Sequence, residues 1–488
     1  MLYDLLIRNV LVIDGSNSPA YPADVAIHGG RIQRIGKLDD VSAKDEIDAN
    51  GRVLAPGFID VHTHDDTVVI RTPQMLPKIS QGVTTVIVGN CGISASPVSL
   101  LAEPPDPMNL LGTAAAFIYP RFSDYRAAVD AARPAVNVAA LIGHTALRSN
   151  HLDDLHRTAT PAEIAAMRTQ LRESLEAGAL GLSTGLAYAS AFSADTDEVL
   201  QLAEELTAFG ALYTTHLRSE FEPVLEAMDE AFRIARHAKA PVVISHLKCA
   251  GAGNWGRSPQ LLAALESAAH THPVGCDCYP YAASSSTLDL KQVTDAFRIT
   301  ITWSTPHPDQ GGRDLIDIAN EWGLSLLDTA RTLQPAGAVY YGMDESDVQR
   351  ILAHPLSMIG SDGLPEDPFP HPRLWGAFPR VLGHFSRDLG LFPLHTAVHK
   401  MTGLSAARFG LHERGEIREG YWADLVLFDP TRIRDVADFN DPQRAAEGID
   451  AVWVNGQLSY AEGQVQGNRQ GRFLPRSGSL NIGFDREF

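Results

Sequence analysis

Hydrophobic and polar positions follow different patterns at the ends and in the middle of the chain. Residues 1–55 and 410–488 alternate apolar and polar side chains over short runs, with turn residues such as the Gly29-Gly30 pair between them. A period of two is typical of strands with one buried face, and a Gly-Gly pair between two runs indicates a hairpin. We therefore expect each end of the chain to form part of one small β-sandwich.

Residues 56–409 change to short apolar runs separated by helical stretches. The clearest helical stretch begins at Thr160-Pro161, has Glu163 in the position of a capping box and ends at Gly178. Two further helical stretches cover residues 196–209 and 221–238. Eight strand candidates precede or follow such stretches: Gly57–Val61, Thr84–Val88, Val136–Ile142, Leu180–Ser183, Leu212–Thr215, Val242–Ser245, Val274–Cys278 and Ser357–Gly360. This alternation predicts an α/β fold, a (β/α)8 barrel of the TIM type.

One segment, residues 284–345, interrupts this alternation between the seventh and the eighth strand candidates. It is much longer than an ordinary connection, and its residues 315–333 are expected to be helical. The segment is either a surface insertion or a lid over the barrel mouth. We expect a lid, because the segment leaves from the C-terminal ends of the strands, where the catalytic residues of such barrels lie.

Residues that bind metals or move protons follow several of the predicted strands. His62 and His64 are two apart after the first strand, so both imidazoles are expected on one face. The later strands are followed by Cys91, His216, His246 and Asp362. Each of these alone is more often a core or loop residue, whereas six around one barrel mouth form a specific constellation. Thiolate and imidazole ligands together favour zinc.

Composition narrows the class of protein. The formal net charge of −19 over 488 residues argues against broad binding to nucleic acid or to an anionic membrane. No apolar run approaches the roughly 18 residues of a membrane span, and no secretory leader is visible. Four cysteines are too few for a disulfide scaffold, so we expect a reducing, cytoplasmic setting. We interpret Cys249, Cys276 and Cys278 as buried structural residues.

Several longer motifs are characteristic of one family. They are Pro56-Gly-Phe-Ile-Asp-Val-His-Thr-His, Gly89-Asn-Cys-Gly, Thr215-His-Leu-Arg, Ser245-His-Leu-Lys-Cys-Ala-Gly, Asp277-Cys-Tyr-Pro-Tyr, Trp303-Ser-Thr-Pro-His-Pro, Gly360-Ser-Asp-Gly and His371-Pro-Arg. With these motifs the chain resembles the amidohydrolase superfamily and, within it, the D-aminoacylase (N-acyl-D-amino-acid deacylase) family. The resemblance covers essentially the whole chain. It implies hydrolysis of N-acyl-D-amino acids to a carboxylic acid and a free D-amino acid, and the preference for the D form rests on the resemblance alone.

The resemblance also implies a set of metal ligands. The wider superfamily often bridges two metals with a carboxylated lysine on the fourth strand, but the fourth strand here ends Gly181-Leu-Ser-Thr-Gly. The implied replacement is Cys91, which with His216 and His246 holds the tighter zinc. The second, weaker site would be formed by His62, His64, Cys91 and Asp362.

Asp362 is the expected catalytic residue. Zinc lowers the pKa of a bound water towards about 7 and polarises a carbonyl group. Asp362, beside the metal, is expected to take the proton of the water and to return it to the leaving amine. Taken alone, the Asp362-Gly363 dipeptide is equally consistent with an ordinary turn.

Other residues are expected to handle the substrate. A bidentate arginine or a lysine suits the α-carboxylate of an N-acyl amino acid. The candidates, of which the resemblance implies the first three, are Lys248, Tyr281, Arg373 and Ser284. Tyr188 resembles a pocket residue, and either His144 or Arg148 could line the barrel mouth.

Arg298 is the residue that bears on which side chain the substrate's D-amino acid carries. Relatives that act on N-acyl-D-glutamate have an arginine just before the Ile-Thr-Trp-Ser-Thr-Pro motif. Here the expected position holds Thr300, and Arg298 is two residues earlier. Arg298 either reaches the substrate from the same face of an extended segment or is a solvated surface residue, so neutral and acidic D-amino acids both stay open.

Two other functions compete with the deacylase. Another amide or cyclic-amide hydrolase of the superfamily, such as a hydantoinase, is disfavoured by the missing lysine on the fourth strand. A non-catalytic barrel that binds a metabolite is disfavoured because every expected ligand is present. The sequence leaves the oligomeric state, the acyl-chain preference and the physiological pathway open.

Overall fold

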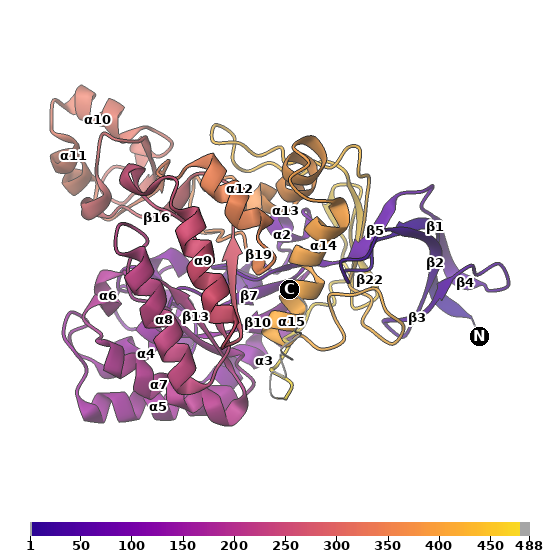
Figure 1. Ribbon diagram of the computed structural model, residues 1–488, viewed down its shortest axis with the longest axis horizontal. Coiled ribbons are helices and arrows are strands. Elements are labelled where there is room, and N and C mark those ends of the chain that lie inside the picture. Colours follow the sequence, from indigo (N-terminus) through magenta and orange to yellow (C-terminus); the bar gives the residue numbers. More distant parts are fainter. Residues whose placement is uncertain (1, 479–488) are drawn as a thin grey trace.

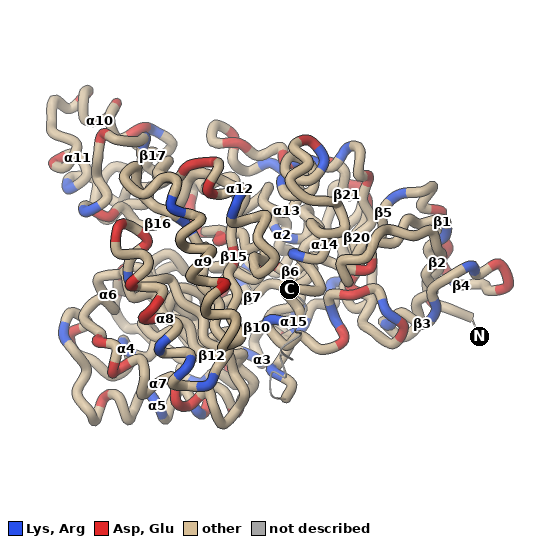
Figure 2. Tube along the Cα trace, viewed as in Figure 1, with Lys and Arg blue, Asp and Glu red and all other residues tan. Residues whose placement is uncertain are grey.

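The computed structural model describes residues 2–478, so residues 479–488 of the predicted C-terminal part lie outside it. The chain is an α/β protein with parallel strands at its centre and helices around them (Figure 1). Acidic and basic positions are interspersed along the outer helices and loops (Figure 2). Among the described residues, no helix combines the length and the apolar character that crossing a membrane would require.

The central strands pair in parallel and in an order that follows the chain. One sheet has the order β10-β7-β6, and the other has the order β11-β12-β13-β14-β15-β19. Their bounds are β6 (Phe58–Asp60), β7 (Val83–Val88), β10 (Asn137–Ala140), β11 (Ile142–Gly143), β12 (Gly181–Gly185), β13 (Leu212–His216), β14 (Val242–Ile244), β15 (Val274–Cys278) and β19 (Ser357–Ile359). Only Leu141 separates β10 from β11, and a parallel bridge joins Thr63, after β6, to Gly363, after β19. Each of the eight predicted strands is therefore found within two residues of its expected bounds, the third split in two.

Helices connect or follow most of these strands. They are α3 (Phe122–Ala132), α4 (His144–His151), α5 (Pro161–Glu176), α7 (Thr196–Phe209), α8 (Val224–Ala238), α9 (Ser258–Ala269), α12 (Glu345–Ala353), α13 (Arg373–Arg380), α14 (Leu394–Met401) and α15 (Gly403–Phe409). The capping box at the start of α5 is confirmed, because Thr160 and Glu163 each bond the backbone N–H of the other. Helix α7 has the predicted bounds, and α8 starts three residues later than expected, after Pro223.

Strands from both ends of the chain join in one nine-stranded sheet. Its order is β23-β22-β21-β20-β5-β1-β2-β3, with β4 paired to β1. The bounds are β1 (Tyr3–Val12), β2 (Tyr21–His28), β3 (Arg31–Gly36), β4 (Ala43–Asp48), β5 (Val53–Pro56), β20 (Leu425–Phe428), β21 (Ile449–Val454), β22 (Gln457–Ala461) and β23 (Gln464–Val465). The antiparallel pair of β5 and β20 connects the two ends. Because β5 runs through Gly57 directly into β6, this sheet is adjacent to the parallel strands in sequence as well as in space (Figure 1).

The segment between β15 and β19 has its own small core. Its strands β16 (Ser284–Thr287), β18 (Ala336–Tyr340) and β17 (Ile299–Ser304) form an antiparallel sheet in this order. The sequence predicted one helical stretch over residues 315–333, but the structure has two helices, α10 (Leu315–Trp322) and α11 (Leu326–Leu333). The break has a local cause: Gly323 ends α10 in the left-handed conformation, with φ of 66°, and Ser325 caps α11. In Figure 1, α10 and α11 project at the end of the molecule opposite the nine-stranded sheet.

Candidate metal centre

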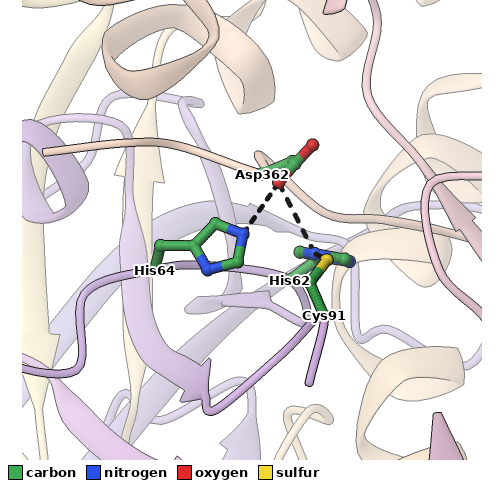
Figure 3. Close-up of side chains that lie close together, drawn as sticks. All are labelled: His62, His64, Cys91 and Asp362. Atoms are coloured by element: carbon green, nitrogen blue, oxygen red, sulfur yellow. Dashed lines mark hydrogen bonds and ion pairs between the residues drawn. The ribbon is translucent and has the colours of Figure 1, made fainter. Parts of the chain in front are cut away.

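Four side chains from three strand ends converge in the interior. His62 and His64 follow β6, Cys91 follows β7 and Asp362 follows β19, and one donor atom from each lies within 4.8 Å of the others. The Asp362 carboxylate is 3.1 Å from His64 Nε2 and 3.5 Å from His62 Nε2 (Figure 3). His62 and His64 thus leave one strand end towards the same point, as their spacing predicts.

A second cluster shares the thiol of Cys91. His216 at the end of β13 and His246 after β14 complete it, again with donor atoms within 4.8 Å of one another. The Cys91 sulfur lies 3.2 Å from His62 Nε2 and 3.4 Å from His246 Nε2. Both ligand sets implied by the sequence are therefore brought together, with Cys91 between them.

The backbone is unusual at three of these six residues. Cys91, His246 and Asp362 have φ values of 53°, 37° and 51°, in the left-handed region that side chains other than glycine rarely adopt. Such conformations cost about 1–3 kcal/mol each and persist only where the surrounding structure imposes them, most often at functional sites. Here all three occur just after a strand end, where the altered backbone direction aims the side chain at the cluster.

The charges in the cluster suit a divalent cation. Burial raises the pKa of Cys91, but His62 and His246 outweigh it and hold the pKa of the thiol well below its usual range. Burial likewise raises the pKa of Asp362, and Arg373 and His62 hold that pKa low. Burial lowers the pKa of His64, yet Asp362 and Cys91 raise it to about 9. A thiolate and a carboxylate thus face several imidazoles, and zinc takes this donor set when it displaces the imidazole protons.

Carboxylates behind the histidines orient the imidazole rings. Asp277, in β15, lies 3.3 Å from His62 Nδ1 and accepts the backbone N–H of His246. Glu220, in the loop after β13, lies 2.9 Å from His246 Nδ1 and 3.8 Å from His216 Nε2. Burial raises the pKa of Glu220, but Lys248 and these two histidines outweigh it, so the carboxyl stays ionised. Carboxylates in such positions select the tautomer and the orientation of metal-binding histidines.

A buried lysine joins the two strand ends that carry His62 and Asp362. Lys78 is fully buried, and its Nζ lies 2.8 Å from the Asp60 carboxylate and 2.7 Å from the Ser361 hydroxyl. Ser361 also donates its backbone N–H to Asp60. One ionic network therefore ties Asp60, two residues before His62, to Ser361, immediately before Asp362.

A cavity of about 520 Å³ opens from the cluster towards the 284–345 segment. His64, His216, His246 and Asp362 form its floor. Of the predicted substrate residues, Tyr188, Lys248 and Ser284 line it. Its other charged lining residues are Asp106, Arg218, Glu220, Asp289 and Lys291. Strand β16 and the following residues up to Gln292 form one wall, so the 284–345 segment contributes directly to the cavity.

Three predicted substrate residues occupy other positions. Arg373 is fully buried beside the cavity and not among its lining residues, with its Nη1 2.9 Å from Asp362 and its Nη2 donating to the Ser285 carbonyl. Its Nη2 thus makes a hydrogen bond and its Nη1 an ion pair, while Nε has no hydrogen-bond partner.

Tyr281 and Arg298 lie away from this cavity. The Tyr281 ring packs against His371 and under the Arg380 guanidinium, and its hydroxyl has no hydrogen-bond partner. Arg298 is half exposed and bonds both carboxylate oxygens of Asp314 at 2.9 Å. Both side chains have tertiary partners of their own here, and their contact with the substrate stays a prediction.

Tyr279 was not singled out by the sequence and lies where Tyr281 was expected. Its ring lies 4.6 Å below the Arg373 guanidinium and 5.7 Å from Lys248 Nζ. The motif Asp277-Cys-Tyr-Pro-Tyr contains both tyrosines, and nothing in the motif distinguishes them. Glu220 and Asp277 were also missed, although the short spacing of Glu220 from His216 was a usable signal.

The remaining candidates have structural roles. His144 and Arg148 are fully buried and both contact Glu198, at 2.8 Å and 2.6 Å, so neither lines the cavity. Cys249, Cys276 and Cys278 are buried free thiols, as expected, and burial raises the pKa of Cys276 to about 12. An un-ionised thiol in an apolar strand is a packing residue and a poor ligand.

Comparison with known proteins places this geometry in a family. The sequence profile of the amidohydrolase family matches residues 45–460. The chain belongs to the amidohydrolase family. Three relatives from Alcaligenes xylosoxydans xylosoxydans match nearly throughout. A D-aminoacylase is 50% identical over 97% of this chain and 98% of its own, an N-acyl-D-aspartate deacylase is 47% identical over 96% and 95%, and an N-acyl-D-glutamate deacylase is 44% identical over 98% and 97%.

Solved structures of amidohydrolases agree with the fold. A crystal structure of D-aminoacylase superposes with a TM-score of 0.95 at 51% identity, over 97% of this chain and all of that one. An N-acyl-D-glutamate deacylase from Bordetella bronchiseptica, complexed with zinc and a phosphonate inhibitor, has a TM-score of 0.94 at 42% identity, covering 98% of this chain and all of that one. A D-hydantoinase from Thermus superposes at 0.61 with 17% identity, over 98% of this chain and all of that one, which supports the shared fold alone.

Proposed function

We propose that this protein is a zinc-dependent hydrolase of N-acyl-D-amino acids, which releases a carboxylic acid and a free D-amino acid. One observation carries the proposal: two ligand clusters share Cys91, and four of their residues line a cavity of about 520 Å³ that is also lined by Lys248. The D-aminoacylase and the two deacylases that match nearly the whole chain support the reaction and the D configuration.

The two clusters assign the metal ligands. Cys91, His216 and His246 would hold the tighter zinc. His62, His64 and Asp362, again with Cys91, would form the second, weaker site. Zinc bound here would polarise the amide carbonyl and make water more acidic. The thiol shared by both groups takes the place of the carboxylated lysine that the fourth strand lacks.

Asp362 would move the protons. Arg373 and the histidines hold its pKa well below the usual range, so the carboxylate is ionised and free to accept the proton of the attacking water. The 2.9 Å ion pair to Arg373 Nη1 occupies Oδ2 and leaves Oδ1 on the side of His64. From there Asp362 would return the proton to the leaving nitrogen, as a general acid.

Polar groups around the cavity would orient the substrate. Lys248 Nζ lies 2.9 Å from His246 Nδ1 and would attract the α-carboxylate, and Ser284 lines the same cavity. The Tyr188 hydroxyl lies 3.3 Å from His216 Nδ1 and is placed to donate a hydrogen bond to the carbonyl oxygen as negative charge develops there. Arg373 would hold Asp362 in place, and Tyr279 would hold Lys248, without touching the substrate themselves.

The strand pairings support the domain organisation predicted from the sequence. We propose that the eight parallel strands close into a (β/α)8 barrel over residues 56–409, with the Thr63–Gly363 bridge as the closing contact. Residues 1–55 and 410–488 would form the β-sandwich. Residues 284–345 would act as the lid, since β16 already forms a wall of the cavity.

The position of Arg298 favours neutral D-amino acids. Its guanidinium is held by Asp314 outside the cavity, and the cavity wall carries acidic as well as basic residues. A second carboxylate on the substrate therefore finds no dedicated arginine from β17 or from the residues just before it. We propose that N-acyl derivatives of apolar D-amino acids are preferred over those of D-glutamate and D-aspartate.

The proposal is tested by zinc content and by amine release from the N-acetyl D- and L-forms of Met, Leu, Phe, Glu and Asp. One or two zinc ions per chain and hydrolysis of the D-forms alone would support it, and faster turnover of D-Met than of D-Glu would support the neutral preference. If the protein contains zinc but hydrolyses none of these amides, its substrate is a different amide. A chain without zinc and without activity would favour a barrel that only binds a metabolite.

A further inference from the structure

Two hydrogen-bond donors face each other beside His246: the N–H of its own ring and the ammonium group of Lys248. His246 Nε2 faces the Cys91 sulfur at 3.4 Å, so this nitrogen must be unprotonated to bind a metal. A neutral imidazole then carries its proton on Nδ1. Lys248 Nζ lies 2.9 Å from that same Nδ1, and an ammonium group can only donate. Lys248 by itself would therefore favour the opposite tautomer, with Nδ1 as acceptor and the proton on Nε2.

Glu220 lies where it can resolve this conflict. Its Oε1 is 2.9 Å from His246 Nδ1 and also accepts from Lys248 Nζ, so one ionised oxygen can take both donors. Its other oxygen lies 3.8 Å from His216 Nε2. All three partners are at least mostly buried, so water competes weakly for these bonds.

The backbone holds Glu220 in this position. Glu220 lies in the loop after β13, and the N–H of Ala250, in the loop after β14, donates to its carbonyl oxygen at 3.0 Å. The loops that carry His216 and His246 are thus joined at Glu220. This hydrogen bond fixes the backbone from which the Glu220 side chain reaches the two histidines.

We propose that Glu220 is a positioning residue that fixes the metal-binding tautomer of His246 against the competing donor Lys248. The inference rests on the proposed zinc site and adds to it the reason why a lysine can stand next to a ligand histidine. Lys248 stays available to the substrate because Glu220, and not His246, accepts its hydrogen bond. The same carboxylate supports His216 more weakly, at the longer distance.

A double-mutant cycle tests this inference through zinc affinity, measured by competition with a chromophoric chelator on the folded protein. Glu220→Gln keeps the volume but removes the charge, so the dissociation constant for zinc should rise by about 10- to 100-fold. Lys248→Met should bind zinc like the wild type. In the double variant, no ammonium competes for Nδ1, so most of the affinity lost in Glu220→Gln should return.

A matched control is Glu198→Gln. Glu198 is also a buried carboxylate that contacts a histidine and a cation, yet its partners His144 and Arg148 lie outside the metal cluster. This variant measures the effect of losing such a charge on folding alone, and its zinc affinity should be unchanged in the folded fraction.

Wild-type zinc affinity in Glu220→Gln would overturn the inference. A double variant that binds zinc as weakly as Glu220→Gln alone would also overturn it, because this result would mean that Lys248 does not compete for Nδ1. Should Glu220→Gln fail to fold, Glu220→Asp is the second variant: it keeps the charge but withdraws the carboxylate from His246 Nδ1, so its zinc affinity should also fall, and wild-type affinity would contradict the proposal. A wild type that binds no zinc would overturn the metal site itself, which is a distinguishable result.

Discussion

Two buried clusters in this protein both combine imidazole and carboxylate groups, and they differ in how these groups are paired. One consists of His62, His64, Cys91 and Asp362 with His216 and His246, and the other consists of His144, Arg148 and Glu198. In the second cluster the guanidinium is surrounded by acceptors: Arg148 bonds both oxygens of Glu198 and three backbone carbonyls. In the first cluster, the donor atoms converge on one another and border a cavity of about 520 Å³.

The comparison shows that buried titratable groups do not by themselves make a site. In the histidine–arginine–glutamate cluster, Glu198 pairs directly with both His144 and Arg148, and these contacts join α4 to α7. The cysteine–histidine–aspartate cluster places a thiolate, a carboxylate and four imidazoles around shared points, where a divalent cation satisfies all of them. Five variants would sharpen or break this distinction.

The largest effect is expected for Cys91→Ala. The thiol belongs to both ligand groups, so its loss should release zinc from both and reduce hydrolysis to the background rate. Metal analysis and amine release from an N-acetyl-D-amino acid measure the two losses together. Retained zinc with a normal rate would remove Cys91 from the ligand set.

Asp362→Asn should separate zinc binding from the rate of hydrolysis. The tighter site does not include Asp362, so it should keep its zinc, while kcat falls by about 10²- to 10⁴-fold because no base accepts the proton of the water. Steady-state kinetics with a parallel zinc determination is the measurement. A nearly normal kcat would place the base at another residue.

Arg373→Ala should act through Asp362. Arg373 holds the pKa of Asp362 down, so in the variant that pKa rises and the ionised base is lost at a higher pH than in the wild type. We expect kcat to fall by about 10- to 100-fold, with the acidic limb of the pH–rate profile moved to higher pH. A change in KM alone, with an unmoved profile, would make Arg373 a direct ligand of the substrate carboxylate instead.

Glu198→Gln should change stability without changing the chemistry. Removing one partner from a buried ionic cluster costs about 3–5 kcal/mol of unfolding free energy. Burial raises the pKa of Glu198, but His144 and Arg148 outweigh it and hold that pKa at about 2. Because this pKa is depressed, the stabilisation is present above the ordinary glutamate value and is lost as the pH falls from about 4.5 towards 2.

Denaturant unfolding at pH 7 and at stepwise lower pH measures this effect. The wild type should lose its advantage over Glu198→Gln as the pH falls, and kcat of the folded variant at pH 7 should equal that of the wild type. A drop in kcat without a drop in stability would show that the two clusters are coupled.

The smallest effect is expected for Arg298→Ala. Its ion pair with Asp314 is half exposed, so its loss should change the unfolding free energy by less than about 1 kcal/mol. The ratio of kcat/KM for N-acetyl-D-Glu to that for N-acetyl-D-Met should stay the same. A selective loss on the glutamate derivative would show that Arg298 leaves Asp314 and meets the substrate.

The sequence by itself determined the strands and the ligand types. Alternation, short apolar runs and capping signals are local, so the eight strands, the capping box at Thr160 and the pairing of both chain ends could be read from the pattern. His62 and His64 were placed together because two residues on one strand share a face. Cys91, His216, His246 and Asp362 followed from their positions at strand ends, supported by the family motifs.

Only the tertiary structure decided which side chain meets which. Tyr279 and Tyr281 stand in the same motif, and their neighbours Arg373 and His371 lie about ninety residues away in sequence. Arg298 pairs with Asp314, and Glu220 lies between two histidines and a lysine. These are contacts between loops, and no local sequence pattern encodes them. The physical reason is that an ion pair forms with whichever partner the fold brings within about 4 Å, and that distance is a property of the packed chain.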